Sequence, residues 1–118
     1  MKNKIRNIHP GEILDEEFLK PMELSAYKVS KITGIPQSRL SEIISGKRSI
    51  SATNALKLGK FFNLPPQFWL TLQNDYDLLE ESRKIETTLS KIHVYTEFVK
   101  DINKQKKMPS VASFSRAT

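Results

Sequence analysis

The sequence predicts a small all-α protein with five helices. Apolar residues recur three or four positions apart through most of the chain, which is the spacing of one face of an α-helix. Proline, serine and glycine fall where such helices would begin or end. The 118 residues, 38% hydrophobic and 27% charged, have the size and composition of one folded domain. We therefore expect one helical domain that carries a C-terminal extension.

The first helix is expected over residues 10–20. Pro10 suits the first position of a helix, and the four acidic residues between positions 12 and 17 lie near the positive end of the helix dipole. Leu14 and Phe18 are four positions apart and share a face. Pro21 cannot continue the hydrogen-bond ladder, so the helix should stop near Lys20.

The second and third helices are short and closely spaced. Ser25 is a good N-cap for the second helix, and Gly34 supplies a left-handed stop. Pro36 suits the first turn of the third helix, in which Leu40 and Ile43 belong to an apolar stripe that ends before residues 45–46.

Two further helices follow. Ser51 is expected to cap the fourth helix, and Pro65 with Pro66 begins the fifth. Helical spacing is shown by Ala55, Leu58 and Phe62, and then by Trp69, Leu72, Tyr76 and Leu79. Ile85, Leu89 and Ile92 continue this period, so we expect the fifth helix to reach the low nineties. Residues 93–99 also fit strand alternation, and we predict helix there.

Composition changes divide the chain into three parts. We expect an N-terminal arm over residues 1–7, a helical domain over 8–91, and a partly flexible C-terminal extension over 92–118. From Asn103 onward the chain is too polar to bury itself.

The charge is distributed unevenly along the chain. Residues 1–60 carry 11 Lys or Arg against 6 Asp or Glu, which gives +5; residues 61–90 carry 2 against 5, or −3; residues 91–118 carry 6 against 2, or +4. These sum to the net charge of +6. A basic amino-terminal half favours a polyanionic partner, and nucleic acid is the first candidate. The alternative is an ordinary solvated basic surface.

Several classes of protein are excluded by what the sequence lacks. There is no cysteine, and the two histidines stand 84 positions apart, so we expect no metal site. No phosphate-cradling glycine loop or nucleophile elbow is present, so we predict no enzyme, no catalytic residue and no cofactor. No apolar run approaches a membrane span or a secretory signal, so we expect a cytoplasmic protein without membrane contact.

The second and third helices form a candidate helix-turn-helix unit. They would meet through the turn Gly34-Ile35-Pro36, with Val29, Leu40 and Ile43 packed between them. Such a unit places its second helix in the DNA major groove. A protein-interaction adaptor could use the same polar face, so this pattern alone leaves both functions open.

The predicted DNA contacts follow from the faces left exposed. Base reading is assigned to Gln37, Ser38, Arg39 and Glu42 of the third helix. Phosphate contacts are assigned to Ser25, Tyr27, Lys28, Ser41, Lys47, Arg48 and Ser49. Arg39 could instead pair with Glu42 three positions on, and Glu42 could orient a neighbouring arginine.

Other conspicuous residues are given structural roles. Trp69, Leu72, Tyr76 and Leu79 are interpreted as a core or a dimer seam, and we predict dimerisation through them. His9 is interpreted as a residue at the start of the first helix, because no catalytic or ligand partner is spaced near it.

Several segments together resemble a known family. They are His9–Leu14, Pro36–Ile43, Gly46–Ile50, and Phe68-Trp69-Leu70 with Leu72-Gln73. This combination is similar to the HigA/VapI group of antitoxins, within the phage-repressor-like (XRE/Cro) helix-turn-helix class, over about residues 8 to 80. Ala26 stands where many phage-type repressors carry a DNA-contacting glutamine, so we expect that contact to be absent.

The resemblance implies a phage-repressor-like bundle and a homodimeric antitoxin. Such a protein would bind double-stranded operator DNA in its own promoter and would neutralise a HigB-type toxin, a ribosome-dependent mRNA endonuclease. A solitary phage- or plasmid-type repressor without a toxin is the alternative. For the toxin we expect an acidic docking face, either on residues 61–90 or on the first helix at Glu12, Asp15, Glu16 and Glu17.

Overall fold

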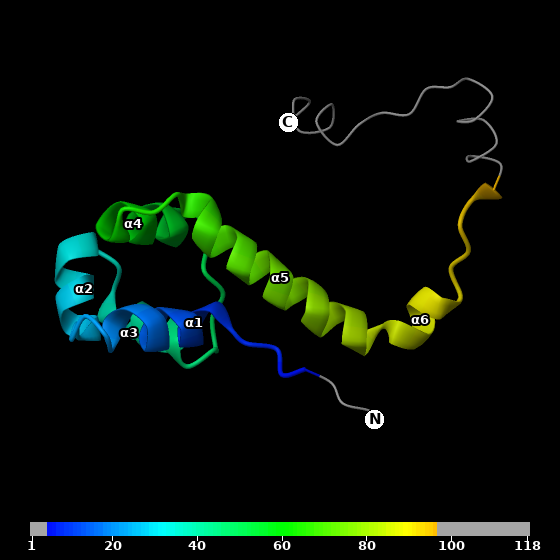
Figure 1. Cartoon of the computed structure of the whole chain (residues 1–118), viewed down its shortest axis with the longest axis horizontal. Coiled ribbons are helices and arrows are strands. Elements are labelled where there is room, and N and C mark those ends of the chain that lie inside the picture. The colour runs from blue at the N-terminus through cyan, green and yellow to red at the C-terminus, as the bar shows by residue number, and fades with distance from the viewer. Residues whose placement is uncertain (1–4, 97–118) are drawn as a thin grey trace, which may run out of the picture. The chain divides into compact units, whose positions relative to one another are not determined.

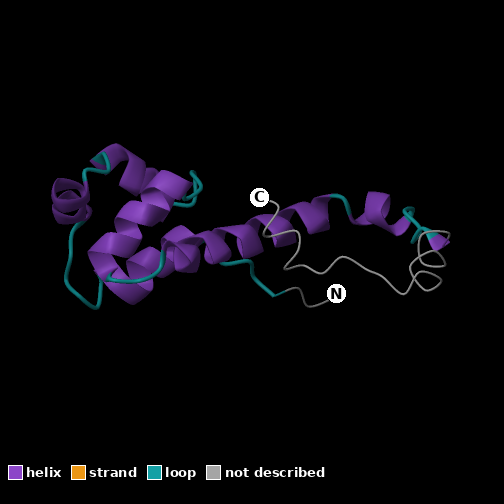
Figure 2. Ribbon diagram, turned by 90° about the horizontal axis from the view of Figure 1, so that it is seen from above, coloured by secondary structure: helices purple, strands orange, loops and turns teal. Residues whose placement is uncertain are grey.

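The computed structural model describes residues 5–96, and every regular element in that range is helical (Figures 1 and 2). The predicted all-α fold is confirmed. The elements are α1 (Pro10–Ile13), η1 (Leu14–Leu19), α2 (Ala26–Thr33), α3 (Gln37–Ile44), α4 (Ala52–Phe62), α5 (Pro66–Lys84) and α6 (Glu86–Ser90). Residues 1–4 of the predicted arm and 97–118 of the predicted extension lie outside the described residues.

Local capping sets most helix boundaries, as the sequence predicts. Ser25 Oγ accepts the backbone N–H of Lys28 at 3.0 Å, and Ser51 Oγ accepts that of Asn54 at 3.2 Å. Gly34 ends α2 with φ 81°, a left-handed conformation that glycine adopts without a Cβ penalty. Pro66 occupies the start of α5, whereas Pro36 is the N-cap of α3 rather than its first residue.

The first helix changes character along its length. It begins as α1 and continues without interruption as the π-helix η1, with Lys20 as its C-cap. The Lys20 N–H donates to the carbonyl of Asp15 at 2.9 Å, five residues back, which is the π-helical pattern. The predicted extent of residues 10–20 is therefore correct, but an α-helix throughout was the wrong geometry.

The fifth helix is shorter than predicted. α5 ends at Lys84, because Ile85 has φ −111° and ψ 26° and leaves the helical conformation. α6 follows as a separate turn, and residues 92–95 are not helical, so the prediction of one helix into the low nineties is wrong. Backbone contacts divide the chain into two units at this break, between Ile85 and Glu86.

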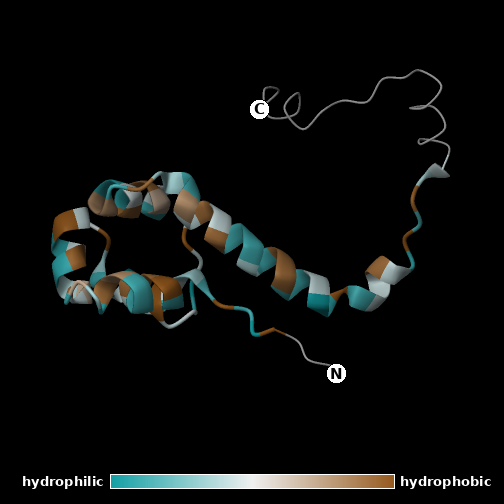
Figure 3. Cartoon of the chain, in the orientation of Figure 1, coloured by the Kyte–Doolittle hydropathy of each residue, from teal (hydrophilic) through white to brown (hydrophobic). Residues whose placement is uncertain are grey.

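The core of the first unit collects apolar residues from η1, α2, α3, α4 and α5 and from the two loops that flank α3. Its buried members are Leu14, Leu19, Val29, Ile35, Leu40, Ile43, Ile50, Ala55, Leu58 and Trp69. Figure 3 shows the hydrophobic residues interleaved with polar ones along the same ribbons. Trp69 is completely buried and contacts the rings of Phe18, Phe62 and Phe68, with centroids 5.0 to 5.9 Å apart.

α1 approaches α3 at one glycine. A Cβ on Gly11 would lie 1.7 Å from the carbonyl oxygen of Ile43, far inside van der Waals contact. The absence of a side chain at position 11 therefore sets how closely the first helix packs on the helix-turn-helix unit.

Among residues 5–96, no helix combines the length and the apolar character needed to span a membrane.

Candidate nucleic-acid interface

α2 and α3 form the predicted helix-turn-helix unit. The three residues chosen from the sequence pack between the helices, since Val29 and Ile43 are 0% exposed and Leu40 is 1% exposed. Ile35 in the turn is also fully buried. The Thr33 hydroxyl donates to the Val29 carbonyl at 2.7 Å and accepts the Ile35 N–H at 3.1 Å, which fixes the turn. α3 is thus held rigidly with its polar face outward.

The predicted base-reading residues all lie on this outward face. Gln37 and Ser38 are exposed at the start of α3, and Arg39 and Glu42 are half-buried. Amide, hydroxyl and guanidinium groups can hydrogen-bond to base edges in a major groove.

Glu42 pairs with a neighbouring arginine, which is one of the alternatives that the sequence leaves open, and that arginine is Arg48. Its carboxylate accepts from Nε of Arg48, six residues on, and this ion pair replaces the Arg39–Glu42 pair considered as an alternative. The loop after α3 brings Arg48 back beside the helix. Arg39 forms no ion pair with any residue between 5 and 96.

The predicted phosphate contacts surround α3. All seven are exposed: Ser25, Tyr27, Lys28, Ser41, Lys47, Arg48 and Ser49. Lys28 and Lys47 have no ion-pair partner in the described part of the chain, so their charges are uncompensated. Ser25 and Lys28 also lie at the N-terminus of α2, where backbone N–H groups favour an anion. The arrangement can hold a phosphate backbone on both sides of α3.

The α3–α4 loop, residues 45–51, carries three of these contacts and is held at several points. Gly46 turns the chain with φ 81°, and the Lys47 N–H donates to the Glu42 carbonyl at 2.8 Å. Ile50 is 3% exposed, and its N–H donates to Oε1 of Gln73 at 2.8 Å. Sequence reasoning gave Gln73 no role, although it is one of the residues that carry the family resemblance.

His9 stands where the first helix, the loop and α5 meet. Its Nδ1 accepts the Gly11 N–H at 2.8 Å, which confirms the predicted place at the start of the helix. The ring meets Tyr76 edge to face at 4.8 Å, and a Cβ on Gly46 would lie 3.7 Å from it. Burial lowers the pKa of His9 from its usual value, and the nearby charge of Asp77 partly opposes this.

The residues of the predicted dimer seam differ in accessibility. Trp69 belongs to the core of its own protomer, so the core alternative holds for it and it offers no surface to a partner. Leu72, Tyr76 and Leu79 are half-buried. The carbonyl of Tyr76 accepts from the Asn7 side chain at 2.9 Å, so the segment before α1 covers part of this helix.

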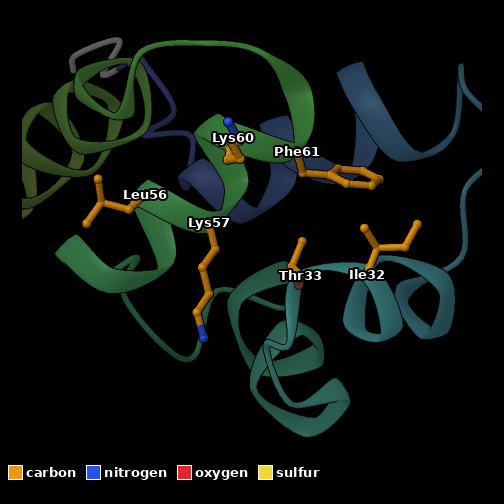
Figure 4. Close-up of a pocket in the computed structure, with 6 residues that line it drawn as sticks. All are labelled: Ile32, Thr33, Leu56, Lys57, Lys60 and Phe61. Carbon is orange, nitrogen blue, oxygen red and sulfur yellow. The ribbon is translucent and has the colours of Figure 1, made fainter.

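A shallow apolar groove lies apart from these positions. Figure 4 shows its six lining residues, with Ile32 and Thr33 on α2 and Leu56, Lys57, Lys60 and Phe61 on α4. None of them is a predicted DNA contact. Between residues 5 and 96, no group of three or more Asp, Glu or His side chains is placed to hold a metal ion.

The buried turn, the outward polar face of α3 and the flanking cations define a DNA-binding helix-turn-helix protein. The helix-turn-helix family HTH_3 matches residues 16–69. Virulence-associated protein I of Dichelobacter nodosus is 48% identical over 77 residues, which are 65% of this chain and 71% of that protein.

Two solved structures are similar over most of the chain. An addiction module antidote protein of the HigA family from Coxiella burnetii has a TM-score of 0.73 and 41% identity, covering 77% of this chain and 100% of that one. The Pseudomonas aeruginosa antitoxin HigA with the higBA promoter has a TM-score of 0.72 and 32% identity, covering 75% and 97%. The chain belongs to the HigA/VapI-type antitoxin family of XRE helix-turn-helix regulators. This is a family of regulators rather than enzymes, as the sequence predicts.

Proposed function

We propose that this chain is an antitoxin and autorepressor that binds an operator in its own promoter as a homodimer and neutralises a HigB-type mRNA endonuclease toxin. One observation carries the DNA-binding part: the cations Lys28 and Lys47, which have no ion-pair partner among residues 5–96, flank the outward polar face of α3. A similar antitoxin, HigA of Pseudomonas aeruginosa, has been solved with the higBA promoter. The protein would act in the cellular compartment that contains its operator DNA.

The proposed contacts divide into two groups with different consequences. Gln37, Ser38, Arg39 and Glu42 would face base edges, where bidentate hydrogen bonds discriminate one base pair from another. The groups around them, among them Lys28, Lys47 and Ser49, would meet phosphates and set register. Arg48 would do so while paired with Glu42, which orients its guanidinium.

A salt titration tests the DNA-binding proposal. Duplexes tiling the DNA directly upstream of the gene are titrated with the full chain at several salt concentrations, beside a scrambled duplex of equal length. We expect one duplex to bind tightly, with log affinity falling linearly against log salt by about 0.9 per phosphate contacted. A protein-interaction adaptor would bind no duplex at any salt concentration, and that result would end the proposal.

The homodimer is supported by the half-buried residues of α5. The proposed seam consists of Leu72, Tyr76 and Leu79. On the same helix, the buried Trp69 packs into the core of its own protomer. A single recognition helix reads only a few base pairs, so a two-fold dimer on a palindromic operator supplies the specificity that one protomer lacks.

The toxin is proposed to dock on an acidic face, and ion pairing favours the face on α5. Glu12 is bonded to Arg6, which lowers the pKa of the Glu12 carboxyl, and Glu16 is paired with Lys20. By contrast Asp77 and Glu80 have no cation within ion-pair distance among residues 5–96. The negative charge of these two α5 carboxylates is therefore not neutralised by an ion pair within residues 5–96, and it would attract a basic partner more strongly.

Co-purification tests the toxin proposal. The product of the gene next to this one is co-expressed with the full chain and with a chain ending at residue 103, and complex formation is compared. We expect both to retain the toxin, because the acidic face lies within residues 61–90. Loss of the complex on truncation, with operator binding retained, would assign neutralisation to the tail. If no toxin gene is adjacent, the solitary repressor replaces the antitoxin.

A further inference from the structure

Gln73 is a polar side chain buried in the core of the first unit. It lies on α5 with 4% of its surface exposed. Its Oε1 accepts the N–H of Ile50, 23 residues earlier, at 2.8 Å, and its Nε2 donates to Oδ1 of Asp77 at 3.0 Å. A buried amide with both ends bonded has one strongly preferred orientation.

Asp77 and the Ile50 N–H together determine that orientation. An amide has a donor end and an acceptor end, whereas an ionised carboxylate only accepts. With Nε2 directed to Asp77, Oε1 is left for the Ile50 N–H, which can only donate. The exposed Asp77 thus holds the Nε2 end of the amide and supports the buried hydrogen bond to Ile50 without entering the core itself.

The hydrogen bond fixes the far end of the cationic stretch in the α3–α4 loop. At the near end, the Lys47 N–H is bonded to the Glu42 carbonyl. Over the described chain, the N–H groups of Arg48 and Ser49 donate to no backbone carbonyl. Apart from the ion pair of the Arg48 side chain with Glu42, the path of the backbone between Lys47 and Ile50 therefore depends on the Ile50 anchor, which consists of its buried side chain and its bond to Gln73.

We propose that Gln73 is a positioning residue for operator binding: from α5 it holds the α3–α4 loop so that Lys47, Arg48 and Ser49 meet phosphates together, and Asp77 orients it. The inference depends on the proposed function, because it takes that loop to contact DNA. The same helix carries the proposed dimer seam, so the spacing of the two recognition helices and the shape of each loop are set by one element.

A purely structural role would have a different signature. A chain that only loses stability has fewer active molecules, but each active molecule still makes every phosphate contact. A chain with a loosened loop stays folded and makes fewer contacts, so the slope of log affinity against log salt becomes shallower. The salt slope therefore separates positioning from stability.

The first test compares the full chain with Gln73→Leu, which removes both hydrogen bonds while filling a similar volume. Hydrogen exchange at the Ile50 amide, the thermal midpoint and operator affinity across salt concentrations are measured. We expect Ile50 to lose protection, operator affinity to fall roughly tenfold, and the salt slope to decrease by about 1 or more. An unchanged affinity and slope in the folded variant would overturn the proposal.

A second pair of variants leaves the core intact. Asp77→Ala and Asp75→Ala each remove one exposed negative charge from α5, so both relieve the same general repulsion of DNA. Only Asp77→Ala frees the Gln73 amide. We expect it to bind the operator at least about twofold more weakly than Asp75→Ala. Equal affinities would show that the orientation of Gln73 is irrelevant to DNA binding.

The reversed pair Q73E/D77N provides a rescue. A carboxylate at position 73 can accept from both the Ile50 N–H and an amide at position 77. The bond to Ile50 then keeps its direction, and only the bond between positions 73 and 77 has its donor and acceptor exchanged. Q73E alone places two carboxylates in contact and should bind worse than the double variant. A double variant no better than Q73E contradicts the proposal. If the unmodified chain binds no upstream duplex, it is the proposed function that fails, not the role of Gln73.

Discussion

At the level of single residues, the proposed DNA-binding face contains cations in two different states. Arg39 and Lys47 have no ion-pair partner among residues 5–96, whereas Arg48 is already paired with Glu42. Free cations can release counterions from DNA directly, while a paired one is constrained in direction. Arg39 and Lys47 can therefore adjust their positions to DNA, whereas the direction of the Arg48 guanidinium is set by Glu42.

Substitutions at Arg39 and Lys47 should separate base reading from phosphate binding. Arg39→Ala is expected to weaken operator binding by roughly 1 to 3 kcal/mol and to relax the preference at one base pair. Lys47→Ala should weaken all duplexes alike and reduce the salt slope by about 1. Measuring the affinity of each variant protein for the operator, and for operators changed at one base pair, distinguishes base reading from phosphate binding. A uniform loss across duplexes for Arg39→Ala would contradict its assignment to base reading.

His9 should make stability depend on pH. Because burial lowers the pKa of His9 in the folded state, folding favours the neutral ring, whose Nδ1 caps α1. This stabilisation is complete above the unfolded pKa of about 6.5 and is lost as the pH falls below it toward the folded pKa. His9→Asn keeps an acceptor for the Gly11 N–H but does not titrate.

Urea unfolding at pH 7.5 and pH 5.5 checks this expectation. The native chain should lose more free energy of unfolding on acidification than His9→Asn does. His93→Asn is the matched control, because His93 is exposed and caps no described helix. Equal pH dependence in the native chain and His9→Asn would show that His9 does not contribute.

At the scale of elements, the packing of the first helix on α3 depends on Gly11. A methyl group there would lie 1.7 Å from a backbone oxygen of α3, which cannot move without displacing the recognition helix. Gly11→Ala should therefore reduce the free energy of unfolding by about 2 kcal/mol or more. Ser49→Ala, on an exposed loop position, should change it by less than about 0.5 kcal/mol. Chemical denaturation measures both, and near-native stability of Gly11→Ala would refute this account of the contact.

The elements show which features a sequence can predict. Ser25, Ser51 and Gly34 act on backbone groups within a few residues, so the starts of α2 and α4 and the end of α2 could be placed from local chemistry. The buried set of Val29, Leu40 and Ile43 followed from helical spacing. The same spacing placed Gln37, Ser38, Arg39, Ser41 and Glu42 on the outward face of α3.

The missed features depend on contacts distant in sequence. The bond from Ile50 to Gln73 spans 23 residues, and Arg48 reaches Glu42 only because the loop folds back. The break at Ile85 and the π-helical geometry of η1 interrupt patterns that continue in the sequence, since apolar spacing persists through both. The spacing of apolar residues predicts which face of a helix is buried, but it does not predict at which residue the helix ends.

At the scale of the whole molecule, α5 is expected to join two protomers. A two-fold dimer would place its recognition helices at half-sites centred about 34 Å apart on a palindromic operator. Leu72→Glu and Leu79→Glu each introduce a charge into the proposed seam and should shift the chain toward monomer and weaken operator binding. Sedimentation at micromolar concentration, with and without the operator duplex, measures this. A native chain that stays monomeric in both conditions would contradict the dimer.

We expect the N-terminus of α2, the outer face of α3 and the α3–α4 loop to bind operator DNA together. Titrating the ¹⁵N-labelled chain with its upstream duplex and following each backbone amide by NMR tests this claim directly. The claim predicts the largest changes at residues 25–28, 37–42 and 47–49, with the α2–α4 groove at Leu56 and Phe61 little affected. Changes centred on that groove or on the acidic part of α5, with those three segments unmoved, would contradict it.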